Sequence, residues 1–257
     1  MKVHSLPGIR AALCSECGAR AGNEDAVSVG QYGPGWYAVL ADGAGGHRQG
    51  AEAARRAVQR LQACLYDATL PWNPESLTQA VMAAHEDVCR GQTMQGADRM
   101  HTTLVALCID ALRGFALWTH VGDSRLYRLR DGVIDIVTRD DTVVYGLLEA
   151  GVLTPAQAQR HPHRNQLIAA LGIPDALEPH TVARQALKDG DVFLLCSDGW
   201  WASAGDALIT SSLANADTPE QWLAAMREGI MRQCRPDQDN FSAIALWVER
   251  SDCSDSK

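Results

Sequence analysis

The stretch Trp36-Tyr-Ala-Val-Leu-Ala-Asp-Gly-Ala-Gly-Gly-His47 decides the fold, because it joins an apolar run to an acidic, glycine-rich loop. Trp36–Ala41 has the length and composition of a buried strand, and Asp42-Gly43 follows it directly. A helical pattern then occupies Ala51–Tyr66. A carboxylate at the end of a buried strand is costly to desolvate unless another group compensates its charge. The stretch therefore predicts an acidic site, compensated by a cation, at the end of a central strand.

Three more acidic patches lie far apart along the chain: Asn23-Glu24-Asp25, Ser197-Asp198-Gly199 and Asp237-Gln238-Asp239-Asn240. The second of these also follows an apolar run directly, Val192–Cys196. A divalent cation compensates several carboxylates at once. Carboxylate sets without histidine or cysteine at ligand spacing suit magnesium and manganese better than zinc. We therefore interpret the four patches as one hard-metal site.

The rest of the pattern indicates an α+β fold. Further strand-like runs, bounded by Gly, Asp or Pro, are found at Thr102–Ile109, Phe115–Val121, Arg125–Arg130, Val133–Val137 and Ala243–Val248. Helical patterns occupy Pro74–Arg90 and the segment from Thr218 to Ile230. Many antiparallel-type strands with helices in blocks favour two packed sheets flanked by helices over alternating βαβ units.

A single domain is expected over residues 1–257, because no repeat, low-complexity tract or Pro/Ser-rich linker interrupts the chain. Residues 139–170 break the rhythm of the strands and are polar, with Arg160-His-Pro-His-Arg164 near their end. We expect this segment to be an exposed flap on the sheet core, where substrate-contacting loops are often found.

Bulk composition excludes several classes of protein. A net charge of -8 argues against a nucleic-acid binder. Met1–Arg10 lacks the apolar core of a secretory signal, and no run approaches the roughly 18 apolar residues of a membrane span. The eight cysteines are scattered, as is typical of a reducing compartment, so a cytoplasmic location is expected. Cys14-Ser-Glu-Cys17 lacks a second ligand pair, so we interpret it as two incidental thiols at a strand end.

The acidic residues and one arginine together predict phosphoester chemistry. Two cations held close together polarise a water molecule and neutralise the charge of a phosphoryl group. Asp42 suits a ligand shared by two ions, and Gly43 lets its own carbonyl approach a cation because it has no Cβ. Arg20 lies just before the first acidic patch, and a guanidinium beside such a site is a natural partner for phosphate oxygens.

Five motifs occur in one order along the chain: Arg20-Ala-Gly-Asn-Glu-Asp25, Asp42-Gly-Ala-Gly-Gly-His47, Val121-Gly-Asp-Ser-Arg125, Leu194-Leu-Cys-Ser-Asp-Gly199 and Asp239-Asn240. In this order they resemble the metal-dependent serine/threonine protein phosphatases of type 2C, in their compact bacterial form. The resemblance covers about residues 12–248, nearly the whole chain. It implies a central antiparallel β-sandwich with helices on both outer faces, in four layers (αββα), and a small flap subdomain.

The resemblance also implies a role for each acidic residue. Asp42 would bridge two Mn²⁺ or Mg²⁺ ions, with the Gly43 carbonyl on the second ion and with Asp198 and Asp239 on the first. A hydroxide between the ions would attack phosphoserine or phosphothreonine in line, without a covalent phosphoenzyme. The remaining implied roles are metal-bound water for Glu24 and Asp25, a third and looser metal for Asp123, and a phosphate clamp for Arg20.

The chain departs from the family pattern in three of its motifs. Animal members carry a histidine after the Asp-Gly of the second motif, often assigned as general acid, where this chain has Ala44. His101 replaces the glycine that usually precedes the Thr-Thr pair, and Asp141-Thr142 replaces a His-Ser pair. Bacterial members commonly lack the histidine as well, so activity is still expected, with leaving-group protonation from metal-bound water or another group. The other two changes lie off the implied metal ligands and affect only local geometry.

The resemblance implies a phosphoprotein substrate, a partner serine/threonine kinase and a monomer. Two other readings remain open at this point. One is a non-catalytic module that keeps the fold to bind a phosphoprotein. The other is a phosphatase for a small phosphomonoester, or a sporulation-type regulator phosphatase, on the same scaffold, because specificity would depend on the flap and the surface around it.

Overall fold

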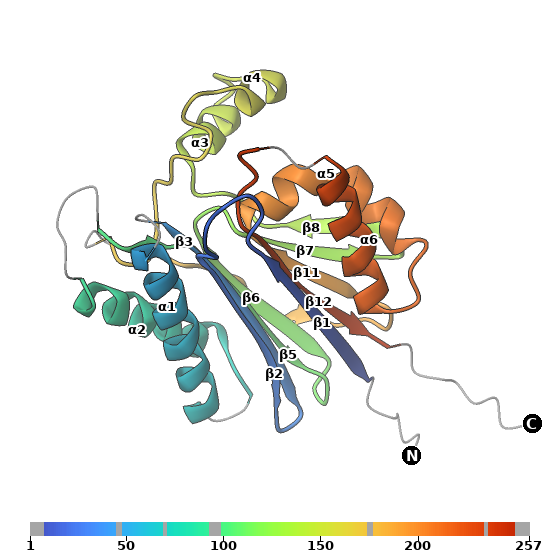
Figure 1. Ribbon diagram of the computed structural model, residues 1–257. Coiled ribbons are helices and arrows are strands. Elements are labelled where there is room, and N and C mark those ends of the chain that lie inside the picture. Colours follow the sequence, from blue (N-terminus) through green and yellow to red (C-terminus); the bar gives the residue numbers. More distant parts are fainter. Residues whose placement is uncertain are drawn as a thin grey trace, which may run out of the picture.

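Two antiparallel β-sheets pack face to face, and helices cover the outer face of each sheet (Figure 1). The computed structural model describes residues 8–44, 48–68, 71–92, 99–173, 177–233 and 236–249. The first sheet has the order β1-β12-β11-β7-β8, with strands Ile9–Glu16, Phe241–Val248, Val192–Cys196, Arg125–Arg130 and Val133–Val137. The second has the order β10-β6-β5-β3-β2, with strands Gln185–Ala186, Phe115–Val121, Leu104–Asp110, Gly35–Ala44 and Asp25–Tyr32.

Short strands and four long helices complete the sandwich. In the second sheet, β4 (His101–Thr102) pairs with β3, and β9 (His180–Thr181) pairs with β6. The helices α1 and α2 pack on this sheet, and α5 and α6 pack on the first one; their bounds are Arg48–Asp67, Pro74–Arg90, Asp198–Leu213 and Pro219–Arg232. The four-layer arrangement expected from the resemblance is therefore confirmed.

The alternation of side chains along β3 separates two of the hydrophobic cores. Val39 and Ala41 point toward α1 and α2, whereas Ala38 and Leu40 point into the space between the sheets. Because successive strand residues face opposite sides, the next residue, Asp42, continues the inter-sheet face. The apolar run of β3 is buried on both sides, and its first polar residue therefore lies where the two sheets end together.

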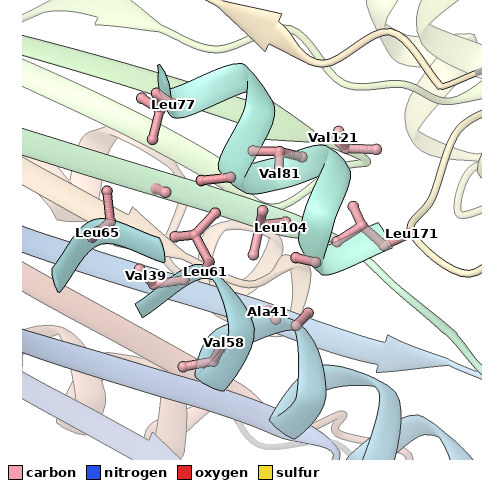
Figure 2. Packing of buried hydrophobic residues seen from close by; sticks show 14 of the residues in the cluster. Val39, Ala41, Val58, Leu61, Leu65, Leu77, Val81, Leu104, Val121 and Leu171 are labelled. Carbon is pink, nitrogen blue, oxygen red and sulfur yellow. The ribbon is translucent and has the colours of Figure 1, made fainter. Parts of the chain in front are cut away.

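Figure 2 shows the core beneath α1 and α2, where side chains of both helices interdigitate with those of the sheet. Leu61 of α1 and Val81 of α2 are fully buried against Leu104 of β5. Leu171, which follows the flap, belongs to the same cluster. The chain leaving the flap is thus anchored in the core next to β4, because Thr102 and Leu171 exchange two backbone hydrogen bonds of 3.1 and 2.9 Å.

Residues 139–170 carry two short helices, α3 (Val143–Glu149) and α4 (Pro155–Gln159), that stand apart from the sandwich (Figure 1). The two chain segments at their base are tied together by hydrogen bonds from Val143 N–H to Gln166 O, at 3.0 Å, and from Ile168 N–H to Asp141 O, at 2.9 Å. This segment is the one expected to be a flap.

Most predicted elements coincide with observed ones, and the differences have local causes. The expected strand at Thr102–Ile109 is divided at Thr103, because Asp42 N–H donates to the hydroxyl of Thr103 and not to its backbone carbonyl. Helix α5 was not predicted, because its sequence has no amphipathic period and contains Gly199 and Gly205, the latter with a φ of 64°. Strand β2 was also missed. None of the helices in the described ranges combines the length and hydropathy that a membrane crossing requires.

Candidate active site

Four acidic segments converge at one end of the sandwich, because antiparallel pairing brings strand ends together. In the second sheet, Asp25 at the start of β2 lies opposite Asp42 near the end of β3. In the first sheet, Cys196 at the end of β11 lies opposite Ala243 of β12, so that Asp198 and Asp239 flank the same sheet edge. The separate patches predicted from the sequence therefore meet between the two sheets.

Direct contacts join the acidic residues of the two sheets. The Ser197 hydroxyl donates to Asp25 Oδ2 at 3.0 Å and accepts a hydrogen bond from Ser242 N–H at 2.9 Å. The carboxyl groups of Asp42 and Asp198 also lie within hydrogen-bonding reach of each other. These side chains thus form one cluster.

Asn240 organises the loop between β1 and β2, a role that was not assigned from the sequence. Its amide nitrogen donates to Cys17 O at 2.9 Å and to Gly22 O at 2.8 Å, and its amide oxygen accepts from Glu24 N–H at 2.9 Å. Gly18 has a φ of +60°, and a Cβ there would lie 2.2 Å from Asp239 O. The loop therefore closes directly on the Asp239-Asn240 segment, and only glycine fits at its tightest point.

Arg20 lies on this loop at the rim of the cluster. It is exposed, and its Nη2 atom donates to Asp239 Oδ2 at 2.9 Å. This ion pair places the guanidinium beside a predicted metal ligand. The remaining guanidinium donors can reach an anion that arrives from solvent.

The main chain around Asp42 is held by the Thr-Thr pair that precedes β5. Asp42 N–H donates to Thr103 Oγ1 at 3.0 Å, and Asp42 O accepts from Thr103 N–H at 2.9 Å and from the Thr102 hydroxyl at 2.8 Å. Thr103 Oγ1 is also 2.7 Å from the hydroxyl of Ser124. The Thr-Thr pair thus links Asp42 to the turn that carries Asp123.

Close packing against α1 fixes Gly43 and Glu24. A Cβ on Gly43 would lie 2.1 Å from Gly50 O, and a Cβ on Gly50 would lie 2.0 Å from Glu24 Oε2. The Glu24 carboxylate therefore lies against the first turns of α1, at a place that only glycine leaves open. The Asp42–Ala44 end of β3 and the 23–25 patch are held against the same helix. His47, which is interpreted from the sequence as a structural residue, falls outside the described residues.

Asp123 is buried in the turn after β6 and is held through its main chain. Trp201 of α5 donates its indole N–H to Asp123 O at 2.9 Å. The Arg125 guanidinium stacks 3.5 Å above the Trp201 ring and forms paired hydrogen bonds of 2.8 and 2.7 Å with Asp140. The turn and α5, which begins at Asp198, are therefore one packed unit.

Burial and mutual repulsion disfavour ionisation of the cluster in the metal-free protein. Burial, with the charges of Asp198 and Asp239, raises the pKa of Asp25 to about 7. Burial and the charge of Asp239 raise the pKa of Asp198 to about 6. Burial also raises the pKa values of Asp42 and Asp123 well above the usual range, with further contributions from neighbouring aspartates. A bound cation would reverse each of these effects.

The donor set fits a hard divalent cation. The side chains of the cluster that could ligate a metal all offer carboxylate oxygens, and Asp25 Oδ1 is a buried oxygen without a hydrogen-bond partner. In the structure, Asp239 pairs with Arg20 and Asp25 with Ser197. Among the described residues, no three His, Cys, Asp or Glu side chains are already arranged as an ion cage.

The flap reaches the edge of the acidic cluster. Asn165 of the flap approaches the cluster, with its amide nitrogen 3.5 Å from Asp198 Oδ2.

Cys14 and Cys17 are both free thiols, and burial raises the pKa of Cys14. No histidine or carboxylate joins them in a metal group within the described ranges.

Comparisons with known proteins assign this chain to a family. Residues 17–239 match the family model described as protein phosphatase 2C. The serine/threonine protein phosphatase PstP of Mycobacterium tuberculosis is 35% identical over 202 residues, which are 78% of this chain but 38% of the relative. The protein phosphatase PhpP of Streptococcus pneumoniae is 32% identical over 193 residues, covering 71% of this chain and 76% of the relative.

A solved structure agrees with this assignment. The crystal structure of the catalytic domain of PstP in complex with two manganese ions has a TM-score of 0.81 at 30% identity, covering 94% of this chain and 98% of that one. This chain spans well under half the length of the full PstP sequence that it matches. Fold and sequence agree over most of the chain, and the chain belongs to the protein phosphatase 2C family.

Proposed function

We propose that this protein hydrolyses the phosphate esters of phosphoserine and phosphothreonine in proteins. The observation that carries the proposal is the convergence of Asp25, Asp42, Asp198 and Asp239 from two sheets, with Arg20 at the rim. Membership of the protein phosphatase 2C family and the two manganese ions of the PstP structure support it.

The residues present would hold two Mn²⁺ or Mg²⁺ ions. Asp42 would be shared between the ions, the Gly43 carbonyl would serve one of them, and Asp198 and Asp239 would serve the other. Glu24 and Asp25 would contribute through water and hydrogen bonds, and a third ion would be held by Asp123 with Asp198. Bound cations would supply the Lewis acidity that activates water and offsets the charge of the phosphoryl group.

The protein's own groups position the ester. The Arg20 guanidinium would bind two non-bridging phosphate oxygens and align the phosphorus with the carboxylate cluster. Asn240 keeps the Arg20 loop in place through its contacts with Cys17, Gly22 and Glu24. Positioning of this kind supplies a large part of the acceleration of a very slow hydrolysis.

A phosphoprotein opposed by a serine/threonine kinase is the substrate that this family membership supports. We propose a monomer that acts in the cytoplasm. The free thiols of the described cysteines, including the buried Cys108 and Cys196, are compatible with a reducing compartment.

Hydrolysis of p-nitrophenyl phosphate with and without Mn²⁺ tests the proposal. We expect activity that EDTA abolishes and that Asp42→Ala and Asp239→Ala reduce by at least about 100-fold, since metal charge stabilisation is worth several kcal/mol. Asp237→Ala is a matched control, because Asp237 is exposed and lies in the same acidic patch as Asp239. Activity that survives EDTA would contradict the proposal. Phosphopeptide binding without cleavage would favour a non-catalytic module.

A further inference from the structure

Two residues that the sequence motifs single out, one after Asp42-Gly43 and one before the Thr-Thr pair, lie directly opposite each other. Ala44 of β3 pairs with His101 of β4 in the antiparallel register, and Gly43 pairs with Thr102. Side chains of directly opposed residues lie on the same face of a sheet. A small residue at position 44 therefore leaves room on that face for the imidazole of His101.

This shared face is the one that carries the acidic cluster. Leu40 and Val105 lie in the core between the sheets, and residues two apart on a strand share a face. Asp42 and Ala44 follow Leu40 at steps of two residues, so they lie on the inter-sheet face of β3. Thr103 and His101 precede Val105 at the same steps, so they lie on the same face, although β4 and β5 are separate strands. The contact of Thr103 Oγ1 with Asp42 N–H agrees with this placement.

The hydrogen bonding of His101 defines its available nitrogen. Nδ1 lies 3.0 Å from Arg99 O, and since a carbonyl oxygen only accepts, Nδ1 carries the hydrogen of this bond. Nε2 is the ring nitrogen left for another partner. The side chain is partly exposed, so that Nε2 can meet a molecule entering from solvent.

The described histidines elsewhere are less suited to this task. His85 and His120 are buried, with 8% and 5% of their surface exposed. His180 Nε2 is engaged with Asp141 Oδ1 at 2.8 Å. His161 and His163 belong to the flap.

We propose that His101 is the general acid that protonates the leaving oxygen of the phosphoserine or phosphothreonine substrate. The inference rests on the proposed function, because it names a further residue for that reaction. A serine alkoxide is a poor leaving group, and a positioned acid typically accelerates such a step by 10²–10⁴-fold. No carboxylate of the cluster can take this role when cations hold the cluster ionised.

The oxygen of water forms a bond to phosphorus while the bond between phosphorus and the seryl oxygen breaks, and its electron pair stays on the seryl oxygen. The imidazolium of His101 gives its Nε2 proton to that oxygen, so that serine leaves as a neutral alcohol. The proton that water loses passes to solvent, and solvent returns one to His101. The products are the dephosphorylated residue and inorganic phosphate.

Dependence on the leaving group tests this role. The full chain with Mn²⁺ is assayed on a phosphoserine peptide, phenyl phosphate and p-nitrophenyl phosphate. We expect His101→Gln to lower kcat on the phosphoserine peptide by roughly 100-fold. On p-nitrophenyl phosphate we expect less than about a 3-fold loss, because p-nitrophenolate leaves without a proton. Mn²⁺ affinity measured by calorimetry should be unchanged, which separates this role from a structural one.

Three further variants make the test decisive. Ala44→His combined with His101→Gln should restore at least about 10-fold of the lost activity, because the imidazole returns to the same face from the opposite strand. His85→Gln, at a buried histidine of α2, is the control and should keep the wild-type ratio of kcat on the peptide to kcat on p-nitrophenyl phosphate. His47→Gln tests the histidine outside the described residues.

The outcomes separate this inference from the proposed function. An equal loss on all substrates with His101→Gln, no loss at all, or a leaving-group-dependent loss only with His47→Gln would each overturn the role of His101. Wild-type protein that cleaves neither the peptide nor p-nitrophenyl phosphate with Mn²⁺ would instead overturn the proposed function.

Discussion

The hydroxyl of Ser197 donates a hydrogen bond to Asp25 Oδ2 at 3.0 Å and so joins the two sheets at the acidic cluster. Ser197 is also the N-cap residue of α5, yet its side chain makes no capping bond to that helix. The hydroxyl instead serves Asp25 and accepts from Ser242 N–H at 2.9 Å. The hydroxyl of an N-cap serine usually stabilises the start of its helix, but here it orients a carboxylate instead.

Ser197→Ala tests this relationship. The substitution leaves the buried Ser242 N–H without its acceptor, so we expect a loss of about 1–3 kcal/mol in the free energy of unfolding, measured by urea denaturation. It also removes one of the hydrogen bonds that orient Asp25, and Mn²⁺ affinity by calorimetry should fall by roughly 10-fold or more, as is typical when an outer partner of a ligand is removed. Ser211→Ala, on the exposed side of α5, should change neither quantity. Unaltered Mn²⁺ affinity in Ser197→Ala would show that this contact does not orient the site.

The raised carboxyl pKa values predict a pH-dependent stability of the metal-free protein. The pKa of Asp25 is about 7 and that of Asp198 about 6, against about 3.9 for an unfolded aspartate. A carboxyl with a raised folded-state pKa contributes its stability fully below the unfolded pKa, and the contribution is lost as pH rises through the folded pKa. The Tm in EDTA should therefore fall between about pH 4.5 and pH 7.5.

Mn²⁺ should oppose this loss, because cations favour the ionised cluster and their binding releases protons. The increase in Tm caused by Mn²⁺ should thus be larger at pH 7.5 than at pH 5.5, and Asp25→Asn should reduce the difference. Scanning calorimetry at both pH values measures it. An Mn²⁺ effect that is the same at both would contradict the raised pKa values.

Asn240→Ala tests the loop that carries Arg20. The variant removes three hydrogen bonds to the 17–24 loop, at Cys17 O, Gly22 O and Glu24 N–H. We expect a loss of about 1–3 kcal/mol in stability, since these groups are partly buried. A rise in KM for the phosphopeptide should accompany it, because Arg20 is no longer held at the rim. The double variant Asn240→Ala/Arg20→Ala should have a KM little higher than that of Arg20→Ala alone. Additive effects of the two changes on KM would contradict the coupling between Asn240 and Arg20.

Asp141 offers a test of the turn that carries Asp123. Its Oδ2 accepts from Gly122 N–H at 2.9 Å, while its Oδ1 pairs with His180. Asp191 is a matched control far from the site, because it likewise accepts a backbone N–H, from Lys188 at 2.9 Å, and pairs with Arg130. Asp141→Asn and Asp191→Asn should both lower stability.

Only Asp141→Asn should weaken the binding of an additional Mn²⁺ at Asp123 and increase proteolysis of the flap, since the Asp141 side chain anchors the residue whose backbone O accepts from Ile168 N–H at the base of the flap. Equal effects of the two variants on Mn²⁺ binding and on flap cleavage would mean that Asp141 is an ordinary structural carboxylate.

The sequence predicts those parts of the fold in which local pattern and tertiary burial agree. Phe115–Val121, Arg125–Arg130 and Val133–Val137 were predicted with the observed bounds, because Gly or Asp lies next to each run on at least one side. Helix α5 was missed since it is packed around Trp200 and interrupted by Gly205, so no single apolar stripe marks it. Tertiary packing on the first sheet, and not helix propensity, stabilises this helix.

The sequence predicts the candidate metal ligands of the site but not the residues that hold those ligands in place. Asp42 follows the apolar run Trp36–Ala41, and Ser197-Asp198 follows the apolar run Val192–Cys196, which is a local signal of compensated charge. Asn240 carries no such signal, because its role depends on contacts with a loop more than 200 residues away along the chain, such as its bond to Cys17. The opposition of Ala44 and His101 likewise depends on strand register, which single-sequence patterns do not define.

Anomalous diffraction from crystals soaked in Mn²⁺ tests the central claim most directly. We predict two strong manganese peaks enclosed by Asp42, Asp198 and Asp239, with the Asp42 carboxylate between them, and their disappearance in Asp42→Ala. Manganese density confined to other parts of the surface, or none at this end of the sandwich, would contradict the account.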